Sequence, residues 1–415
     1  MKKSFHYAWV NAAVCMLVLF ACGTVCQTYG VFLRPIAADL GVGMGKVSGA
    51  ITVLNCVVAL SGPLAAGIVD RFGMRRVLPL ALLGVAAALT ALSSARTLAA
   101  VYILYALCGC GLYYGLYFLC PYIVNRWYRA RVAETIALII TAMAVGGAVG
   151  NLVLGKRITA AGWRSAYRME AIFLCAAAVI AFLFLRDDPA DKGCQPFGAA
   201  EKTAGPVMQT DCKGGRGLTA VSVLKRPEFY LLVFYVAAMQ FCVGMQSQIP
   251  NLALSVGLSA AVGASAASVN SLGGIPAKAM LSLLNVRIGV VRSVLLYNAV
   301  GIAGLLGILF FTNSVGIHLF AILFGFAIGS TTVQLPLMSN RLFGGSEAYG
   351  KIHARIVLVS GLLATPSSLL AGMVYDKTGN YTLFLILLAV LLAAAAVLAA
   401  RAWRLAGNNG GSVSV

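Results

Sequence analysis

Few ionisable side chains in this sequence stand inside long apolar stretches, and Lys278 is the most informative of them. It lies in the middle of the apolar run 262–284, close to Pro276, Met280 and Leu281. A charged group at such a depth in an apolar helix is rare, and it usually binds a ligand or lines an ion pathway. An ammonium group there predicts an anionic ligand. The alternative is a lysine that extends along its flexible stem to an interface.

Arg355 and His353 are the next candidates, at the start of the apolar run 350–374. A second cation beside Lys278 would suit a ligand with two carboxylates. Arg355 could equally belong with Lys351 to a basic helix end that faces water, and the sequence leaves both interpretations open. His353 is interpreted as an interfacial residue rather than as a proton relay.

Polar side chains inside other apolar runs complete the candidate site. Tyrosine combines an apolar ring with one hydrogen-bond donor, which suits a small carboxylate on a short carbon skeleton. Each of them taken singly could instead pack between helices or lie in an interfacial belt. Only as a set with Lys278 do they predict a substrate cavity. The candidates are Tyr29, Tyr113, Tyr114, Tyr117, Gln240, Gln246 and Gln334.

Acidic residues near the apolar runs are few, and we interpret all of them as lying at run ends: Glu134, Glu170, Glu347 and Asp376. On this interpretation no buried carboxylate is available to carry a proton through the middle of a membrane. Anion exchange or uniport is therefore expected in place of proton-coupled transport.

Catalytic and metal-binding patterns do not occur in the sequence. There is no HExxH, GxSxG or Walker loop, so we expect no enzyme activity and no ATP-driven pump. The eleven cysteines lie mostly within apolar runs, and without paired CxxC motifs they are interpreted as small helix-packing residues. We expect no cofactor and no metal, and the energy for transport must come from gradients.

The elements that position these side chains follow from composition. Of 415 residues, 60% are hydrophobic and 10% are charged, against about 25% charged in soluble domains. The apolar runs are about 20 residues long, which is the length of a membrane-spanning α-helix. The sequence predicts an all-α polytopic membrane protein with twelve spans, the first retained because it is too long for a signal peptide. The spans lie at about 7–33, 46–69, 77–94, 98–124, 133–155, 165–185, 229–254, 262–284, 293–313, 315–340, 350–374 and 382–402.

The net charge of +19 is interpreted as an orientation signal, because no basic stripe alternates with aromatic residues as in nucleic-acid surfaces. Cytoplasmic loops carry an excess of lysine and arginine. That rule predicts that both termini are cytoplasmic, in a bacterial inner membrane. The predicted cytoplasmic basic residues, besides those of the central loop, are Lys2, Lys3, Arg71, Arg75, Arg76, Arg126, Arg129, Arg131, Arg287, Arg292, Arg341, Lys351, Arg401 and Arg404.

The twelve runs divide six and six around a gap. We predict an N-terminal bundle at 1–185, a flexible cytoplasmic loop at 186–228 and a C-terminal bundle at 229–415. A short repeat supports two related halves. Asp70, Arg71, Gly73, Arg75 and Arg76 follow the second run, and Arg287, Gly289 and Arg292 follow the eighth with matching spacing. Paired halves predict a substrate site at their interface near mid-membrane.

Asp70-Arg71-x-Gly73-x-Arg75-Arg76, after span two of twelve, resembles the signature loop of the major facilitator superfamily, with Ala66 where that loop usually has glycine. Other pieces resemble the monocarboxylate transporters and the oxalate–formate antiporters. They are Tyr29-Gly30-Val31-Phe32 with Pro35-Ile36 and Leu40-Gly41, Asn125 to Ala133, Gly162-Trp163-Arg164, Gly372, Tyr375-Asp376, Thr378-Gly379 and Tyr381. The similarity covers nearly the whole chain. It implies the major facilitator fold, with a gating role for Asp70 and its neighbouring arginines.

The resemblance also assigns roles in the site. Lys278 stands where the related carriers have an arginine that binds the substrate carboxylate, and Arg355 lies close to a second cation of the antiporters. Lysine offers a compact charge in place of a planar fork, so specificity is expected to differ. Proton-coupled relatives have an aspartate and a lysine where this sequence has Gly274 and Gln27, which also argues against proton coupling.

The predicted function is secondary transport of small organic anions, mono- or dicarboxylates, by alternating access in a lipid bilayer, with the chain working as a monomer. Two alternatives remain. The chain could carry a different small solute, by proton-coupled uptake or by efflux, or it could be a receptor that binds a carboxylate without carrying it. A receptor should carry an added output domain, and the central gap and the short tail offer none.

Overall fold

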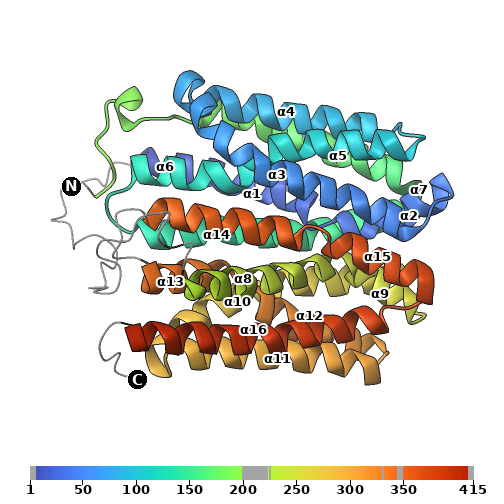
Figure 1. The fold of residues 1–415 in the computed structure, drawn as a ribbon. Helices are drawn as coiled ribbons and strands as arrows, with labels where there is room; N and C mark the ends of the chain where they lie inside the picture. Colours follow the sequence, from blue (N-terminus) through green and yellow to red (C-terminus); the bar gives the residue numbers. More distant parts are fainter. Residues whose placement is uncertain (1–5, 199–222, 224–225, 330, 344–348, 410–415) are drawn as a thin grey trace. The chain divides into compact units, whose positions relative to one another are not determined.

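The computed structural model describes residues 6–198, 223, 226–329, 331–343 and 349–409, and within these ranges it is almost entirely helical (Figure 1). Several residues singled out above lie outside the described residues or have side chains that are not described: Lys2, Lys3, Arg341, Glu347, Lys351, Arg404 and the basic residues within 199–225. The chain divides into two compact units, Met1–Pro206 and Val207–Val415. Each unit is described by itself.

The N-terminal unit contains six spans. Two of these spans share the label α7, and the backbone turns between them at Gly162. The φ of Gly162 is 77°, a conformation that favours glycine. The helices are α1 (Ala8–Cys26), α2 (Tyr29–Leu40), α3 (Met44–Phe72), α4 (Met74–Leu92), α5 (Leu98–Tyr113), the π-helix η1 (Tyr114–Phe118), α6 (Leu119–Trp127), α7 (Val132–Phe184) and the short 3-10 helix η2 (Pro189–Lys192).

The C-terminal unit repeats this arrangement with its own interruptions. Its elements are α8 (Pro227–Val243), the 3-10 segment η5 (Gly244–Gln248), α9 (Ile249–Ser255), α10 (Ala260–Arg287), α11 (Val290–Phe310), α12 (Ser314–Gly329), α13 (Thr331–Phe343), α14 (Tyr349–Ala364), α15 (Ser367–Thr378) and α16 (Thr382–Asn409).

Ten helices of the described chain are long and apolar enough to cross a membrane. One of them, Glu134–Phe184, makes two spans when divided at Gly162. The 28-residue α10 is not among the ten, because serine, glycine, asparagine and Lys278 interrupt its apolar character. The ten helices, the second span of α7 and the α10 helix together account for the twelve predicted spans. The prediction of an all-α polytopic membrane protein is confirmed.

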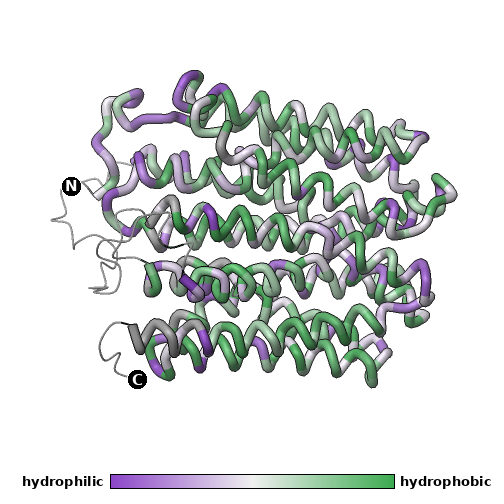
Figure 2. The backbone as a smooth tube through the Cα atoms, viewed as in Figure 1, coloured by the Kyte–Doolittle hydropathy of each residue, from purple (hydrophilic) through white to green (hydrophobic). Residues whose placement is uncertain are grey.

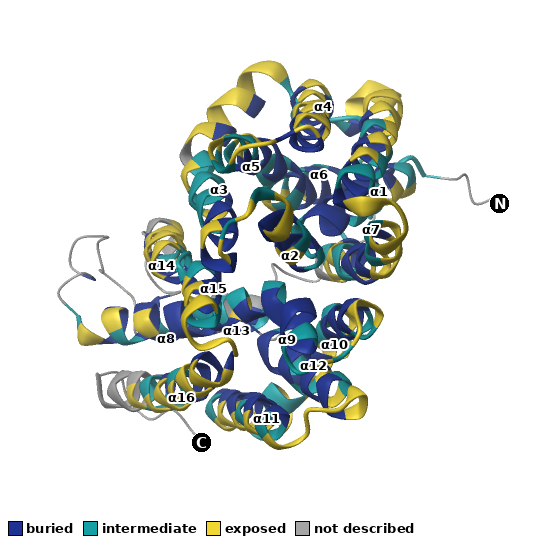
Figure 3. Ribbon diagram, turned by 90° about the vertical axis from the view of Figure 1, so that its right-hand side faces the viewer, coloured by how far each residue is buried: buried dark blue, intermediate teal, exposed yellow. Residues whose placement is uncertain are grey.

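The surface of each unit suits lipid. Hydrophobic residues run along most of every helix, and hydrophilic ones gather near helix ends (Figure 2). Large apolar side chains point outward, among them Leu64, Ile172 and Phe310, while the buried residues line the inner faces of the helices (Figure 3). Exposed apolar area of this extent would be unfavourable in water and is expected in a bilayer. The protein is therefore a multi-pass membrane protein.

Three glycine turns of the first unit recur in the second. Gly41, Gly73 and Gly162 all have positive φ, and their counterparts Gly257, Gly289 and Gly379 do too. The separations are 216, 216 and 217 residues. Gly73 and Gly289 also share nearly the same ψ, 148° and 159°, and each precedes the first residues of a helix. The repeat predicted from the arginine-rich loops thus extends to the backbone of both units.

Helix interruptions also pair between the units. The break between α1 and α2 at Gln27 and Thr28 lies 216 or 217 residues before the 3-10 turn that opens η5 at Gly244. Further interruptions are the π-helix η1 and the boundary of α14 and α15. The predicted spans were continuous. Discontinuous helices in transporters commonly mark the substrate site.

Candidate functional site

Lys278 lies on α10, half-buried. Nine residues separate it from Arg287 at the end of the helix, or about 13 Å at 1.5 Å per residue. Its turn of helix is held by a small buried cluster in which Ala277 and Leu281 pack with Tyr297. The Tyr297 hydroxyl donates a hydrogen bond to the Ala277 carbonyl over 2.6 Å. The ammonium group is therefore carried by a firmly packed segment well inside the span.

The α10 helix contacts the described end of α12 one turn before Lys278. Gly274 lies so close to Gly329, the last residue of α12, that a Cβ on Gly329 would overlap the Gly274 Cα. Val333, at the start of α13, packs on the same small cluster as Ala277. The predicted cation thus lies one turn from a close backbone contact between α10 and α12.

Two of the predicted glutamines join helices of this unit. Gln334, on α13, is buried, and its side-chain oxygen accepts a hydrogen bond from the hydroxyl of the buried Tyr235 on α8. Gln240, one turn further along α8, donates to the Ser360 hydroxyl on α14 over 3.4 Å. The α8 helix thus bears polar contacts on both sides, and the side chain of Gln240 remains partly exposed.

The second predicted cation stands near the start of α14. Arg355 is exposed, and His353, two residues before it, has its Nδ1 atom 2.8 Å from the Ser339 hydroxyl on α13. The histidine thus ties α14 to α13, a role that the sequence did not indicate. The predicted role of Arg355 in binding the substrate stays a prediction.

The four predicted tyrosines belong to the N-terminal unit, and Tyr29 and Tyr117 differ in exposure. Tyr29 opens α2, is buried, and has its ring centroid 5.5 Å from that of Tyr105 on α5. Tyr117 lies in the π-helix η1, and 61% of its surface is exposed. It stacks on Tyr113 with ring centroids 5.9 Å apart. Tyr29 is therefore part of a packed aromatic cluster, and Tyr117 is the accessible one.

One interpretation of the sequence is wrong. Glu170 does not lie at a span end: it stands eight residues past the Gly162 turn on α7, with 3% of its surface exposed. Its Oε1 atom is buried without a hydrogen-bond partner among the described residues. The predicted span began at 165 and so placed Glu170 near a terminus, whereas the helix starts earlier and its tertiary neighbours bury the carboxyl group.

A second buried polar cluster was also missed. Gln248, at the end of η5, donates to the Ser368 hydroxyl on α15 over 3.2 Å and accepts from the Tyr381 hydroxyl over 3.0 Å. Ser247 and Ser368 are 3.0 Å apart through their hydroxyls. This cluster joins the 3-10 interruption of α8–α9 to the interruption between α14 and α15, and it fixes both breaks.

The predicted flexible loop begins as an ordered segment. Residues 185–198, here called the strap, cross the basic end of the N-terminal unit. The Arg186 backbone exchanges hydrogen bonds of 3.1 and 3.0 Å with the Asn11 side chain, and its carbonyl also accepts from the Trp127 indole. Asp188 forms a 3.0 Å ion pair with Arg126. The strap is thus a loop held by specific contacts. The predicted loop at 186–228 stays a prediction, because residues 199–222 and 224–225 lie outside the described part.

The signature loop contacts the strap through a carboxylate that the sequence did not single out. Asp187 accepts a 3.0 Å hydrogen bond from the Arg75 backbone N–H in the first turn of α4. Gly73 leaves room for it, since a Cβ there would meet the Asp187 Oδ2 atom. Burial raises the pKa of Asp187, and the Arg75 N–H partly opposes that shift. Asp70, for which the resemblance implies a gating role, is exposed.

The remaining residues of the two predicted loops lie at the surface of their units. The Arg71 guanidinium lies 5.3 Å from the ring centroid of Phe72. Arg76, Arg287 and Arg292 are exposed, and Gly289 begins α11. These positions are compatible with anchoring, and the gating role stays a prediction.

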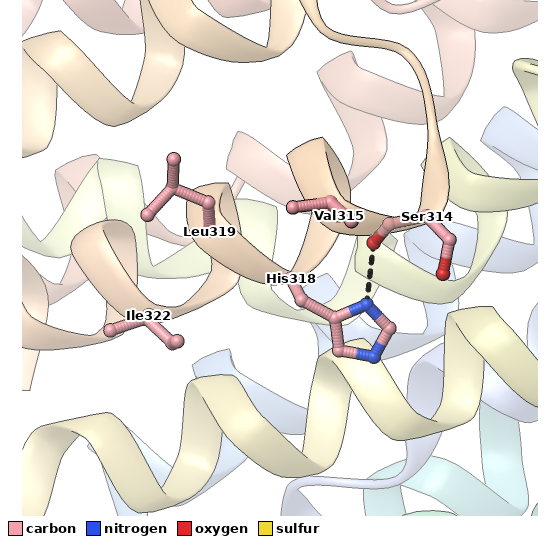
Figure 4. Close-up of a pocket in the computed structure, with 5 residues that line it drawn as sticks. All are labelled: Ser314, Val315, His318, Leu319 and Ile322. Carbon is pink, nitrogen blue, oxygen red and sulfur yellow. Dashed lines mark hydrogen bonds between the residues drawn. The ribbon is translucent and has the colours of Figure 1, made fainter.

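A shallow hollow lies on the surface of α12 (Figure 4). All its lining residues come from that one helix: Ser314, Val315, His318, Leu319 and Ile322. The two His318 ring nitrogens are engaged, Nδ1 with the Ser314 carbonyl at 2.7 Å and Nε2 with the Ser265 hydroxyl at 2.9 Å. The hollow contains none of the predicted site residues. In the described chain, no three histidine, cysteine or acidic side chains gather as metal ligands.

Solved structures of other transporters are similar to this fold. No curated protein matches the chain. A bacterial homolog to the human lysosomal transporter Spinster, solved in an inward-facing and unoccupied conformation, has TM-score 0.73 and 15% identity, covering 100% of each chain. The same homolog in an occupied conformation has TM-score 0.68 and 14% identity over 96% of this chain and 98% of that one. The nucleoside transporter NupG has TM-score 0.71 and 11% identity, over 96% and 99%. These likenesses show the fold.

The family is shown by the sequence itself. The family model for the Major Facilitator Superfamily matches residues 15–350, which is most of the chain. This agrees with twelve spans in two related units and with the paired glycine turns. The chain belongs to the Major Facilitator Superfamily, and it is a membrane transporter of a small solute.

Proposed function

We propose that this protein is a secondary transporter of small organic anions, mono- or dicarboxylates, that works by alternating access. The observation that carries the proposal is Lys278, a half-buried ammonium group about 13 Å inside its helix. Residues 207–415 contain four acidic residues. Of these, Glu228 and Asp376 stand in the first turn of α8 and near the end of α15, while Asp211 and Glu347 are not described. Glu228 is buried, but it stands at a helix end. Away from the helix ends, the described part of this unit therefore carries a positive charge, which favours an anion.

Other polar groups of the same unit suit a small substrate. Gln240 and Ser360 supply an amide and a hydroxyl between α8 and α14, and Tyr235 and Gln334 supply another pair between α8 and α13. Such groups fix the orientation of a ligand that a charge attracts. We propose Arg355 as the second cation for a dicarboxylate, and the resemblance to oxalate–formate antiporters and monocarboxylate transporters supports the same substrate class.

The mode of coupling needs a separate argument. The prediction of exchange or uniport rests on the absence of a buried carboxylate. Glu170 is buried, so this reason for excluding proton coupling no longer holds. The substrate class does not depend on this point, because it rests on Lys278. Carriage of a cationic solute is disfavoured by the same charge. The likeness to a nucleoside transporter at 11% identity concerns the fold.

Counterflow in proteoliposomes tests the proposal. Labelled oxalate, formate, lactate and pyruvate are offered outside vesicles loaded with each anion in turn. We expect accumulation of at least one of them that requires an internal anion. Folded protein that moves none of the four would refute the carboxylate assignment and leave the family membership unchanged.

Substitution of Lys278 tests the residue that carries the proposal. Lys278→Ala removes a charge-assisted contact, whose loss costs about 1.5–3 kcal/mol, so substrate affinity should fall at least about tenfold and counterflow should reach background. Lys278→Arg keeps the charge and should retain measurable flux. Lys377→Ala, an exposed lysine in the last turn of α15, serves as the matched control. Wild-type flux in Lys278→Ala would contradict the assignment.

A further inference from the structure

Glu170 is buried among polar groups that the proposed substrate site does not use. It lies on the second half of α7, about 12 Å past the Gly162 turn at 1.5 Å per residue. Its Oε1 atom is buried without a hydrogen-bond partner among the described residues, and the Thr24 side chain is its hydrogen-bond neighbour. The carboxyl group thus lies deep in the N-terminal unit, next to Thr24, which stands two residues before the end of α1 at Cys26.

The direction of the Thr24 hydroxyl shows which form of the carboxyl group fits. Thr24 Oγ1 donates its single proton to the Ala21 carbonyl over 2.7 Å, a local contact typical of threonine in helices. Toward Glu170 it can therefore only accept. A hydrogen bond between the two side chains then requires a proton on Glu170, so the geometry fits the neutral acid.

The other groups around Glu170 do not supply a counter-charge. The titratable side chains that face it come from α1, α5 and α7 and are Cys26, Tyr105, Cys108 and Tyr167. The Tyr105 and Tyr167 hydroxyls share one hydrogen bond of 2.8 Å. All are neutral in their ordinary form, and burying an ionised carboxylate beside them without a cation is far costlier than burying the acid.

The nearest arginines of the same helix are engaged elsewhere. Arg164 forms a 2.7 Å ion pair with Asp39, and Arg168 donates to the Ser93 hydroxyl over 3.3 Å. The α4 helix, which also packs on α7, carries its cations Arg75 and Arg76 in its first turn, close to the strap. The surroundings of Glu170 therefore favour binding of a proton.

We propose that Glu170 is a proton-binding site of this transporter, occupied by a proton in the conformation described here. It lies beside the break between α1 and α2, so a movement of this break that admits water would let the carboxyl group release its proton. Resting on the proposed function above, we infer that this proton accompanies the anion. One proton and one monocarboxylate moving together carry no net charge, so the step balances without another ion.

Infrared spectroscopy of the purified full-length protein tests the site without knowledge of the substrate. We expect the carbonyl band of a protonated carboxyl group at neutral pH in the wild type and in Glu134→Gln, an exposed acid on the same helix. That band should disappear from the spectrum of Glu170→Gln, which keeps the shape of the neutral acid. Identical spectra for wild type and Glu170→Gln at neutral pH would overturn the proposal.

If Glu170→Gln does not fold, a second variant tests the proposal. Thr24→Val retains the carboxyl group and removes only its acceptor, so the band should persist at neutral pH and shift in frequency. An unchanged band would show that the carboxyl group does not donate to Thr24, and it would overturn the proposed geometry.

A transport measurement tests the coupling. With acid outside, a gradient of one pH unit should drive about tenfold accumulation of a labelled monocarboxylate in the wild type and in Glu134→Gln. Glu170→Gln should lose this accumulation and keep counterflow. Equal pH-driven accumulation in Glu170→Gln and wild type would refute the coupling. If the wild type moves none of the anions, the proposed substrate class fails, and the infrared result still decides the proton site.

Discussion

Asp187 illustrates how a single side chain connects three parts of the N-terminal unit. Its carboxyl group lies in the strap, accepts the backbone N–H of Arg75 in the first turn of α4, and occupies the space that Gly73 leaves open. An acceptor at a helix N-terminus satisfies an otherwise unpaired N–H and interacts favourably with the helix dipole. Burial opposes the charge at the same time.

Substitutions at Asp187 should separate these two effects. Asp187→Ala loses the acceptor and should lower the free energy of unfolding by about 1 kcal/mol, the usual size of a lost helix cap. Asp187→Asn keeps an acceptor without the charge and should stay close to wild type. Thermal unfolding in detergent provides the measurement. Equal losses in both variants would show that the negative charge, and not the acceptor, stabilises α4.

The raised pKa of Asp187 gives a pH dependence with a definite sign. The folded protein holds this proton more tightly than the unfolded chain, whose pKa is close to 3.8. As pH rises from 3.8 through the folded value, the unfolded state loses the proton first, so the contribution of Asp187 to stability decreases. The difference in stability between wild type and Asp187→Asn should therefore shift against wild type with rising pH. A constant difference from acid to neutral pH would contradict this assignment.

At the scale of the helices, close backbone contacts determine where α10 and α12 can lie. Gly329 faces the Gly274 Cα with no room for a Cβ, whereas a Cβ on Gly274 would lie 3.4 Å from the Gly329 Cα, an ordinary contact. The interface is thus asymmetric. Small residues allow such approach between helices in membranes, and here the contact lies one turn from Lys278.

This asymmetry predicts unequal effects of two equally small substitutions. Gly329→Ala should force the helices apart and lower stability by about 1–3 kcal/mol, as overpacking usually does. Gly274→Ala should stay near wild type. Thermal unfolding and counterflow of both variants provide the comparison, with Gly84→Ala on α4 as a control, because nothing lies within 4 Å of its new Cβ. Equal behaviour of Gly329→Ala and Gly274→Ala would show that the helices adjust freely.

At the scale of the whole molecule, the twelve predicted spans are an even number, which predicts that both termini lie on the same side of the membrane. The distribution of lysine and arginine predicts that this side is the cytoplasm. Epitope tags at the two ends should therefore become accessible to antibody only after the membrane is permeabilised. A tag that is accessible in intact cells at either end would contradict the predicted orientation.

The sequence predicts the positions of the spans, but it does not predict where the helices are interrupted or which polar groups are buried between them. Hydropathy locates each run because lipid requires long apolar helices, but it cannot distinguish the 3-10 turn of η5 from the α-helix around it. Glu170 was missed for a different reason: Thr24 and Tyr105, which surround it, are distant in sequence. The strap was missed because a charged, aperiodic segment gives no sign that Asn11 and Trp127 will bind it. Lys278 could be found because its charge conflicts with its local sequence.

The paired glycine turns have an evolutionary consequence. A nearly constant separation of 216 or 217 residues across three turns is the trace expected of a duplicated gene segment whose two copies have exchanged almost no length since. On that offset Lys278 corresponds to Gly62, and Glu170 corresponds to Leu387. Neither ionisable group has an ionisable counterpart in the sister copy. The two copies have therefore diverged at both positions, and on the proposals made above one copy would bind the anion and the other the proton.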